Sequence, residues 1–176
     1  PYKHDLVKIV DYIPYNQFFK YYTIFNSNEN IEIKSSTIRE YLHNDIGAHL
    51  LGYVGKTSRR DISRDDDSKY YESTGRTGIE KYYDKKLRGK LGYQVVKVNS
   101  IYETIEVLSE VESEKKDIQL TIDIDLQKYI HELFGDRAGA VIVMNAHNGE
   151  LLAAGSFPEF DNNLFVNGIS HANWNK

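Results

Sequence analysis

The stretch from Gly75 to Gly92 constrains the fold more than any other, because it contains signals for where a helix begins and ends. Thr77 and Glu80 have the Ser/Thr-x-x-Glu spacing of a capping box, in which each side chain accepts a hydrogen bond from the other residue's amide. Glycines suit the bends on either side, because they adopt left-handed conformations without strain. We therefore predict one short helix between glycine-rich bends. Its apolar face comprises Ile79, Tyr82, Tyr83 and Leu87.

Further short motifs stand in order along the chain, one before this stretch and four after it. They are His-Leu-Leu-Gly-Tyr-Val-Gly at residues 49–55, Leu-Thr-Ile-Asp at 120–123, Gly-Glu-Leu-Leu-Ala at 149–153, Ser-Phe-Pro at 156–158 and Asp-Asn-Asn-Leu-Phe at 161–165. Together they resemble the pattern of class B penicillin-binding proteins, in particular those that act in cell elongation, with Asn162 where proline is usual. By this resemblance the linker motif comprises Gly75, Gly78, Ile79, Glu80, Tyr83, Leu87, Gly89 and Gly92.

The resemblance implies an α+β fold with short helices and antiparallel strands, arranged as an elongated two-lobed pedestal. It places a head lobe at residues 1–48 and a linker lobe at residues 49–117. The first helix and β-hairpin of a truncated transpeptidase domain would follow at residues 118–176. The charged segment 110–117 is typical of a domain boundary and fits this division.

Alternation of apolar and polar residues predicts strands in the middle of the chain. Residues 93–98 and 101–111 are expected to pair through a tight connection at Asn99-Ser100. Residues 118–122 are strand-like as well, and they would lead directly into the transpeptidase-like portion.

A helix and a hairpin are predicted next. Asp123 or Asp125 can cap the helix, and Gly135 can end it. Asn148-Gly149 is the strongest short hairpin signal in the chain, so the apolar runs on either side are expected to pair. The apolar face of the helix comprises Leu126, Tyr129, Ile130, Leu133 and Phe134.

Composition excludes several kinds of site. The chain has 176 residues, a formal net charge of −4 and no cysteine, so neither a basic nucleic-acid surface nor a cysteine-based metal site is expected. No apolar run reaches the roughly 18 residues of a membrane-spanning helix. Asp65-Asp66-Asp67 lacks the alternation, the glycine and the later glutamate of a calcium loop, so we interpret residues 56–69 as a solvated loop or helix face. No cofactor is expected.

A stripe of aromatic residues at helical spacing follows Pro14. Packing into the core of a small lobe accounts for such a stripe most simply. The aromatic density nevertheless exceeds what one helix face needs, so we also predict a partner-binding surface here. That surface comprises Tyr15, Phe18, Phe19, Tyr21, Tyr22 and Phe25.

The catalytic motifs of the family do not occur in their expected setting. The family acts through an acyl-enzyme on a Ser-x-x-Lys serine, completed by Ser-x-Asn and Lys-Thr-Gly or Lys-Ser-Gly motifs. Ser113 to Lys116 matches Ser-x-x-Lys by letter, but it lies in an acidic, solvated segment without the dry pocket that a serine nucleophile needs. We therefore predict no catalytic residue in this chain. An intact small enzyme that uses Ser113 is a rival hypothesis.

The resemblance implies a non-catalytic pedestal of a penicillin-binding D,D-transpeptidase. The pedestal would position the catalytic domain on the periplasmic side of the cytoplasmic membrane, with the membrane anchor in a segment absent here. Its implied partners are the scaffold protein MreC and the glycosyltransferase RodA. Two lobes joined through glycine bends can change their angle, so a partner that prefers one angle would shift the population toward it. The alternative is a free-standing periplasmic binding module with no enzyme attached, which has no need of strands at residues 118–170.

Overall fold

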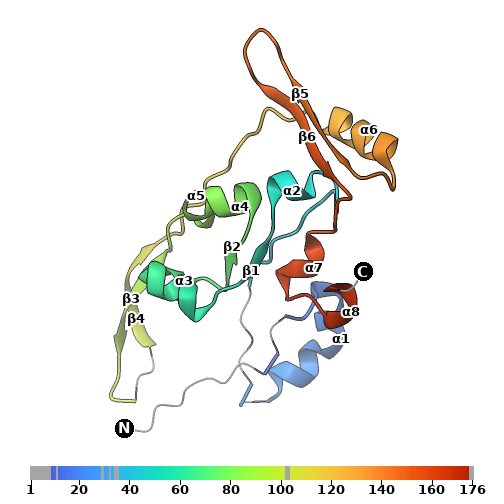
Figure 1. Ribbon diagram of the computed structural model, residues 1–176. Coiled ribbons are helices and arrows are strands. Elements are labelled where there is room, and N and C mark those ends of the chain that lie inside the picture. The colour runs from blue at the N-terminus through green and yellow to red at the C-terminus, as the bar shows by residue number, and fades with distance from the viewer. Residues whose placement is uncertain are drawn as a thin grey trace. The chain divides into compact units, whose positions relative to one another are not determined.

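The computed structural model describes residues 9–10, 12–28, 30–31, 33, 36–101 and 104–174. It has an α+β fold of short helices and antiparallel strand pairs, which confirms the predicted fold class (Figure 1). The chain divides into two compact units, Pro1–Ile38 and Arg39–Lys176. The domain boundaries at residues 48 and 117 stay predictions. Within the described ranges, no helix combines the length and the apolar character needed to cross a bilayer.

The first unit contains helix α1, Tyr15–Asn26, which follows directly on Pro14. Proline suits the start of a helix, because its φ is already helical and the first amides have no partner within the helix. The helix ends at Ser27, whose hydroxyl donates to the Thr23 carbonyl oxygen at 2.6 Å. Residues 31–34 alternate between apolar and polar residues as a strand does, and they lie partly outside the described residues.

The second unit begins with the elements around the linker motif. Strands β1 and β2 pair antiparallel, and the chain between them forms α3 and the 3-10 helix η1. Helix α3 has a true capping box, in which Ser58 Oγ accepts from the Asp61 amide and the Asp61 carboxylate accepts from the Ser58 amide. In order, the elements are α2 (Ala48–Leu51), β1 (Val54–Lys56), α3 (Arg59–Arg64), η1 (Asp66–Tyr70), β2 (Ser73–Gly75), α4 (Gly78–Tyr82) and α5 (Asp84–Arg88).

The single helix predicted for the linker motif is wrong, because the chain forms α4 and α5 with a break at Tyr83. The predicted capping box is also wrong. Thr77 makes no side-chain cap hydrogen bond, and the Glu80 carboxylate instead pairs with Arg39. Arg39 offers the Glu80 carboxylate two charged donors, whereas a capping box would offer it one main-chain amide, so Glu80 turns inward. The predicted apolar face is wrong for Tyr82 and Tyr83, which are 81% and 38% exposed, whereas Glu80 is buried.

Strands β3 (Tyr93–Val98) and β4 (Thr104–Val111) pair antiparallel, as predicted. The predicted start of the second strand at residue 101, directly after Asn99-Ser100, is wrong, because Ile101 lies in a turn and β4 begins at Thr104. The pairing continues past the hairpin in a bridge between Lys90 and Glu114. Large apolar side chains on both strands are exposed, among them Tyr93, Ile105 and Leu108.

The final part of the chain packs one helix on one hairpin. Helix α6 lies along β6, which Figure 1 shows in orange. Asp123 caps α6 by accepting from the amides of Asp125 and Leu126, and Gly135 ends it, as predicted. The predicted hairpin is confirmed, with Met144 paired to Leu151. The elements are α6 (Ile124–Phe134), β5 (Gly139–Met144), β6 (Leu151–Phe157), α7 (Asn163–Val166) and α8 (His171–Trp174).

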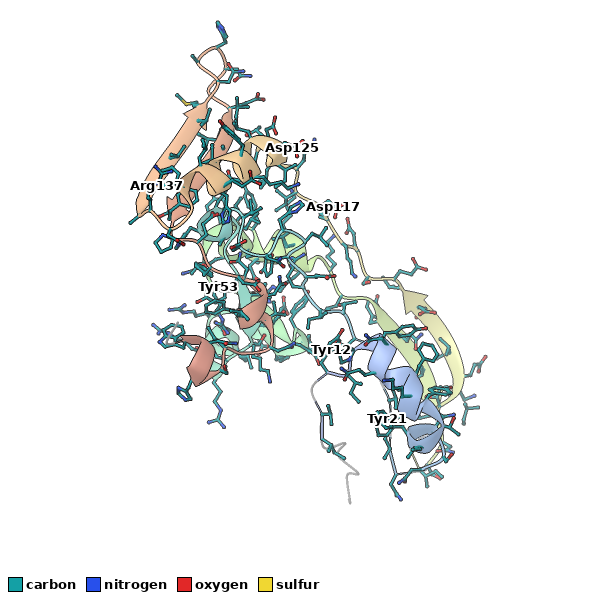
Figure 2. The ribbon with its side chains drawn as sticks, turned by 90° about the vertical axis from the view of Figure 1, so that its right-hand side faces the viewer. Tyr12, Tyr21, Tyr53, Asp117, Asp125 and Arg137 are labelled. Carbon is teal, nitrogen blue, oxygen red and sulfur yellow. The ribbon has the colours of Figure 1, made fainter. Side chains whose placement is uncertain are left out.

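Two predictions about α6 and its approach are wrong. Residues 118–122 form no strand; the chain runs extended past Asp117 to Asp125 in the first turn of α6 (Figure 2). Leu133 is 50% exposed and Tyr129 58% exposed, so the buried face is rotated from the predicted one.

Gln127 lies on the buried face of α6 because its amide completes the hydrogen bonds of β6. Its Oε1 accepts from the Ala154 amide at 2.9 Å, and its Nε2 donates to the Ala154 carbonyl at 3.1 Å. Beside it, Ile130 packs with Ala153 and Phe157 of β6. A buried amide that satisfies a strand in this way avoids the cost of unpaired main-chain groups.

Candidate functional site

The glycines of the linker motif are close-contact positions. An added Cβ at any of them would come nearer to a main-chain atom of another segment than real Cβ atoms do. Gly78 and Gly89 also have positive φ angles of 57° and 69°, which other residues rarely adopt. The main-chain partners are Glu80 for Gly75, Leu50 and Gly52 for Gly78, Glu114 for Gly89, and Val111 for Gly92. These bends are therefore tightly packed, and Ile79 and Leu87 between them are half-buried.

Glu80 connects the linker motif to Arg39, the first residue of the second unit. Arg39 Nε lies 2.9 Å from Glu80 Oε1, and Arg39 Nη2 lies 3.2 Å from Oε2. Burial raises the pKa of Glu80, and the Arg39 charge and a Tyr41 hydrogen bond offset this only in part. Burial also raises the pKa of Tyr41, with the charge of Glu80 adding to it, and the Tyr41 hydroxyl accepts from the Val54 amide at 3.0 Å.

Two arginines of the linker stretch pair with residues 56–69, the segment that the sequence led us to interpret as solvated. Arg76 Nη1 lies 2.8 Å from Asp61 Oδ2. Burial raises the pKa of Asp61, but hydrogen bonds from Ser58 and the pairing with Arg76 outweigh it and lower the pKa to about 2. Arg88 Nη2 lies 3.1 Å from Asp65 Oδ2. The solvated interpretation is thus wrong for Asp61 and Asp65, whose carboxylates face these arginines.

Two neighbouring asparagines bind main-chain groups far away in the sequence. Asn162 is fully buried, and its Nδ2 donates to the carbonyls of Gly52 at 2.7 Å and Ala48 at 3.3 Å. Asn163 Oδ1 accepts from the Tyr41 amide at 2.9 Å, and its Nδ2 donates to the Tyr41 carbonyl at 3.0 Å. Asn162 makes no side-chain cap of α7, so a capping role is excluded for it.

Glu159 is a third such residue, and sequence reasoning found no role for it. Its side chain is fully buried, with Oε1 accepting from the Gly47 amide at 2.8 Å and Oε2 lying 2.7 Å from His131 Nδ1. Next to it, His49 Nε2 lies 3.2 Å from the Pro158 carbonyl oxygen, so His49 is a hydrogen-bonding structural histidine. The sequence signal for these contacts was the polar cluster after the Ser-Phe-Pro motif.

The aromatic residues of α1 are largely exposed, and Figure 2 shows Tyr21 on this helix. Tyr15 is 73% exposed and Phe19 58% exposed, and their rings meet edge to face at 4.5 Å. Phe18 and Phe25 are half-buried, and no residue of α1 is buried. The core-packing interpretation of the stripe therefore does not describe α1 in this structure. The remaining exposed members are Tyr21 and Tyr22.

Ser113 lies in an open position after β4, and it is exposed. The lysine at the fourth position of its motif, Lys116, has its Nζ 3.4 Å from Glu114 Oε1. Across the described parts of the chain, no group of His, Cys, Asp and Glu residues could hold a metal ion.

The penicillin-binding protein dimerisation domain model matches residues 2–120. The chain is 39% identical over 154 residues to the peptidoglycan D,D-transpeptidase MrdA of Haemophilus influenzae, covering 84% of this chain and 24% of that protein. It is 40% identical over 147 residues to the MrdA of Escherichia coli K12, covering 80% of this chain and 23% of that protein. The chain thus spans about a quarter of the length of these relatives.

Solved structures agree with this match. A complex between penicillin-binding protein 2 and MreC from Helicobacter pylori is 40% identical, with a TM-score of 0.89 over 97% of this chain and 32% of that chain. Penicillin-binding protein 2 of the same organism has a TM-score of 0.76 over 99% of this chain and 34% of that chain. The chain therefore belongs to the class B penicillin-binding proteins and corresponds to the N-terminal pedestal region of a penicillin-binding protein 2.

Proposed function

We propose that this chain is the non-catalytic pedestal module of a peptidoglycan D,D-transpeptidase of cell elongation. In this proposal it positions the catalytic domain and receives the scaffold protein MreC. The similarity to the penicillin-binding protein 2 of a complex with MreC, over nearly the whole chain, carries the proposal. The names of the curated relatives support the transpeptidase activity of the parent protein.

The location and a second partner follow from family membership. We place the module on the periplasmic side of the bacterial inner membrane, where the transpeptidases of this family act on peptidoglycan. The glycosyltransferase RodA is the second proposed partner. Co-purification of RodA with the membrane-anchored parent protein is the expected result. Loss of RodA from a preparation that retains MreC would contradict this part of the proposal.

Helix α1 is the proposed surface for MreC. Its exposed aromatic residues present a large apolar area, and the tyrosines among them add a polar hydroxyl, a combination that is typical of residues that dominate binding energies. Isothermal titration of the periplasmic part of MreC into the chain should give saturable binding. Tyr21→Ala should weaken this binding about tenfold or more. Tyr129→Ala on α6 is the matched control, because Tyr129 is 58% exposed against 51% for Tyr21.

The absence of catalysis in this chain is the remaining part of the proposal. The exposure of Ser113 and the pairing of Lys116 with Glu114 support it, since a nucleophile needs an unengaged base beside it. A fluorescent penicillin should therefore leave the chain unlabelled. Labelling that disappears on Ser113→Ala would overturn this assignment and favour the small-enzyme hypothesis.

The free-standing binding module is the alternative function. The packing of α6 on the β5–β6 hairpin speaks against it, because a pedestal alone has no use for the start of a catalytic sheet. The gene product that contains this chain should therefore bind fluorescent penicillin as a whole. A gene product that ends near Lys176 would favour the alternative.

A further inference from the structure

We propose that Glu159, Asn162 and Asn163 are positioning residues that fix the start of the transpeptidase region onto residues 41–52 of the pedestal. These three side chains, with the main-chain atoms they bind, are called the joint below. The proposal rests on the proposed function in one respect, namely that a catalytic domain follows this region. The contacts themselves lie within the single compact unit Arg39–Lys176.

The joint connects segments that are far apart in the sequence. Glu159 and the Gly47 amide are 112 residues apart, and Asn163 and Tyr41 are 122 residues apart. Apart from a longer contact of 3.4 Å from Asn163 Nδ2 to Asn44 Oδ1, the acceptors and donors on the pedestal side are main-chain atoms. These bonds therefore constrain mainly the path of the backbone. Asn163 binds both the amide and the carbonyl of Tyr41, as a neighbouring strand would.

Because the Glu159 and Asn162 side chains of the joint are buried, the joint depends on their charge and on their hydrogen-bonding groups. The Asn162 side chain is fully buried, and its Oδ1 has no hydrogen-bond partner among the described residues. Its Nδ2 serves two carbonyl oxygens, so a carboxylate in its place would put negative charge against both of them. The Glu159 carboxylate is equally buried and is satisfied on both oxygens by Gly47 and His131.

Aromatic contacts surround the polar ones. The Tyr53 ring stacks on Phe165 with centroids 4.1 Å apart, and Figure 2 shows Tyr53 beside the α7 segment. His49 meets Phe160 edge to face at 4.9 Å. The rings fill the space between the segments, while the hydrogen bonds set their register. Together with the close-packed glycines, this makes a change of angle between α4 and the β5–β6 hairpin unfavourable.

Distance measurement by double electron–electron resonance tests the joint without any partner protein. The chain has no cysteine, so nitroxide labels can be placed on cysteines introduced at Lys81 in α4 and His147 in the β5–β6 loop, both exposed. We expect one narrow distance distribution for the otherwise unchanged chain. Glu159→Ala and Asn162→Asp should each broaden it at least twofold.

Two further variants separate positioning from general destabilisation. Glu159→Gln keeps an acceptor for the Gly47 amide and should restore the narrow distribution. Asn167→Ala is the control, because Asn167 is exposed, lies four positions after Asn163, and makes no side-chain hydrogen bond within the described part of the chain.

If the Asn162→Asp variant does not fold, the Glu159→Ala and Asn163→Ala variants decide the outcome. Asn163 is half-exposed. Unchanged widths in both of these variants, in samples whose circular dichroism is native, would overturn the joint. Because MreC is absent from this experiment, its failure is distinguishable from a failure of the proposed function.

Discussion

Replacing Gly78 by alanine tests whether the linker motif needs glycine for close packing. At φ +57°, an alanine would be in the left-handed region, which costs about 1–2 kcal/mol. Its Cβ would also lie 2.5 Å from the Leu50 carbonyl oxygen and 2.6 Å from the Gly52 amide nitrogen. Because both are main-chain atoms, the backbone must shift, and overpacking of this kind costs about 1–3 kcal/mol. The free energy of unfolding should therefore fall by about 2–5 kcal/mol.

Gly149→Ala is the matched control for this substitution. Gly149 also has a positive φ, +78°, but among the described residues nothing outside its chain neighbours lies within 4 Å of an added Cβ, so only the conformational cost of about 1–2 kcal/mol applies. Urea denaturation followed by circular dichroism measures both variants, and Gly78→Ala should also melt roughly 4–20 °C lower than the parent chain. Equal losses for the two variants would refute the close-packing argument.

Asp61→Asn should lower the free energy of unfolding at pH 7 by about 1–2 kcal/mol, because Asp61 contributes stability above its ordinary pKa of 3.8 and loses it as the pH falls through about 2. In urea denaturation at a series of pH values, the free energy of unfolding should fall less on acidification for this variant than for the parent chain. An equal fall in both would contradict the expectation. Glu80→Gln should act in the opposite sense: the raised pKa of Glu80 gives stability that is fully present below its ordinary value of 4.5 and is lost as the pH rises through the raised one. As the pH rises above 4.5, the free energy of unfolding should therefore fall less for Glu80→Gln than for the parent chain. An identical decline in both would contradict a raised pKa of the buried Glu80 carboxyl. Gln127→Leu leaves the Ala154 amide and carbonyl without their partner, so we expect a loss of about 1–3 kcal/mol in thermal unfolding, and a neutral result would show that the helix-to-strand bonds contribute little.

Elements with local signals could be predicted from the sequence. The β3–β4 pair follows from alternation, the start of α6 from the Asp123 cap, and the last hairpin from Asn148-Gly149. Each of these signals acts within a few residues, so the rest of the fold does not have to be known. The α+β class follows from them directly.

Side chains that bind distant partners could not be predicted in the same way. The spacing of Thr77 and Glu80 fits a capping box, but Arg39 competes for the carboxylate from 41 residues away. Gln127 looks like the polar side of α6 until Ala154 of β6 is beside it. The spacing within the Asp161–Phe165 motif indicates no distant partner, and only the fold brings Asn162 to Ala48 and Gly52. Interactions over such separations depend on the tertiary structure, which spacing does not encode.

Hydrogen exchange of the chain, alone and at a saturating concentration of periplasmic MreC, tests most directly whether this pedestal receives the scaffold protein. We predict that MreC slows exchange in peptides covering Tyr15–Asn26 and leaves the β5–β6 hairpin unchanged. Unchanged exchange throughout the chain, or slowing confined to the β5–β6 hairpin, would contradict the account.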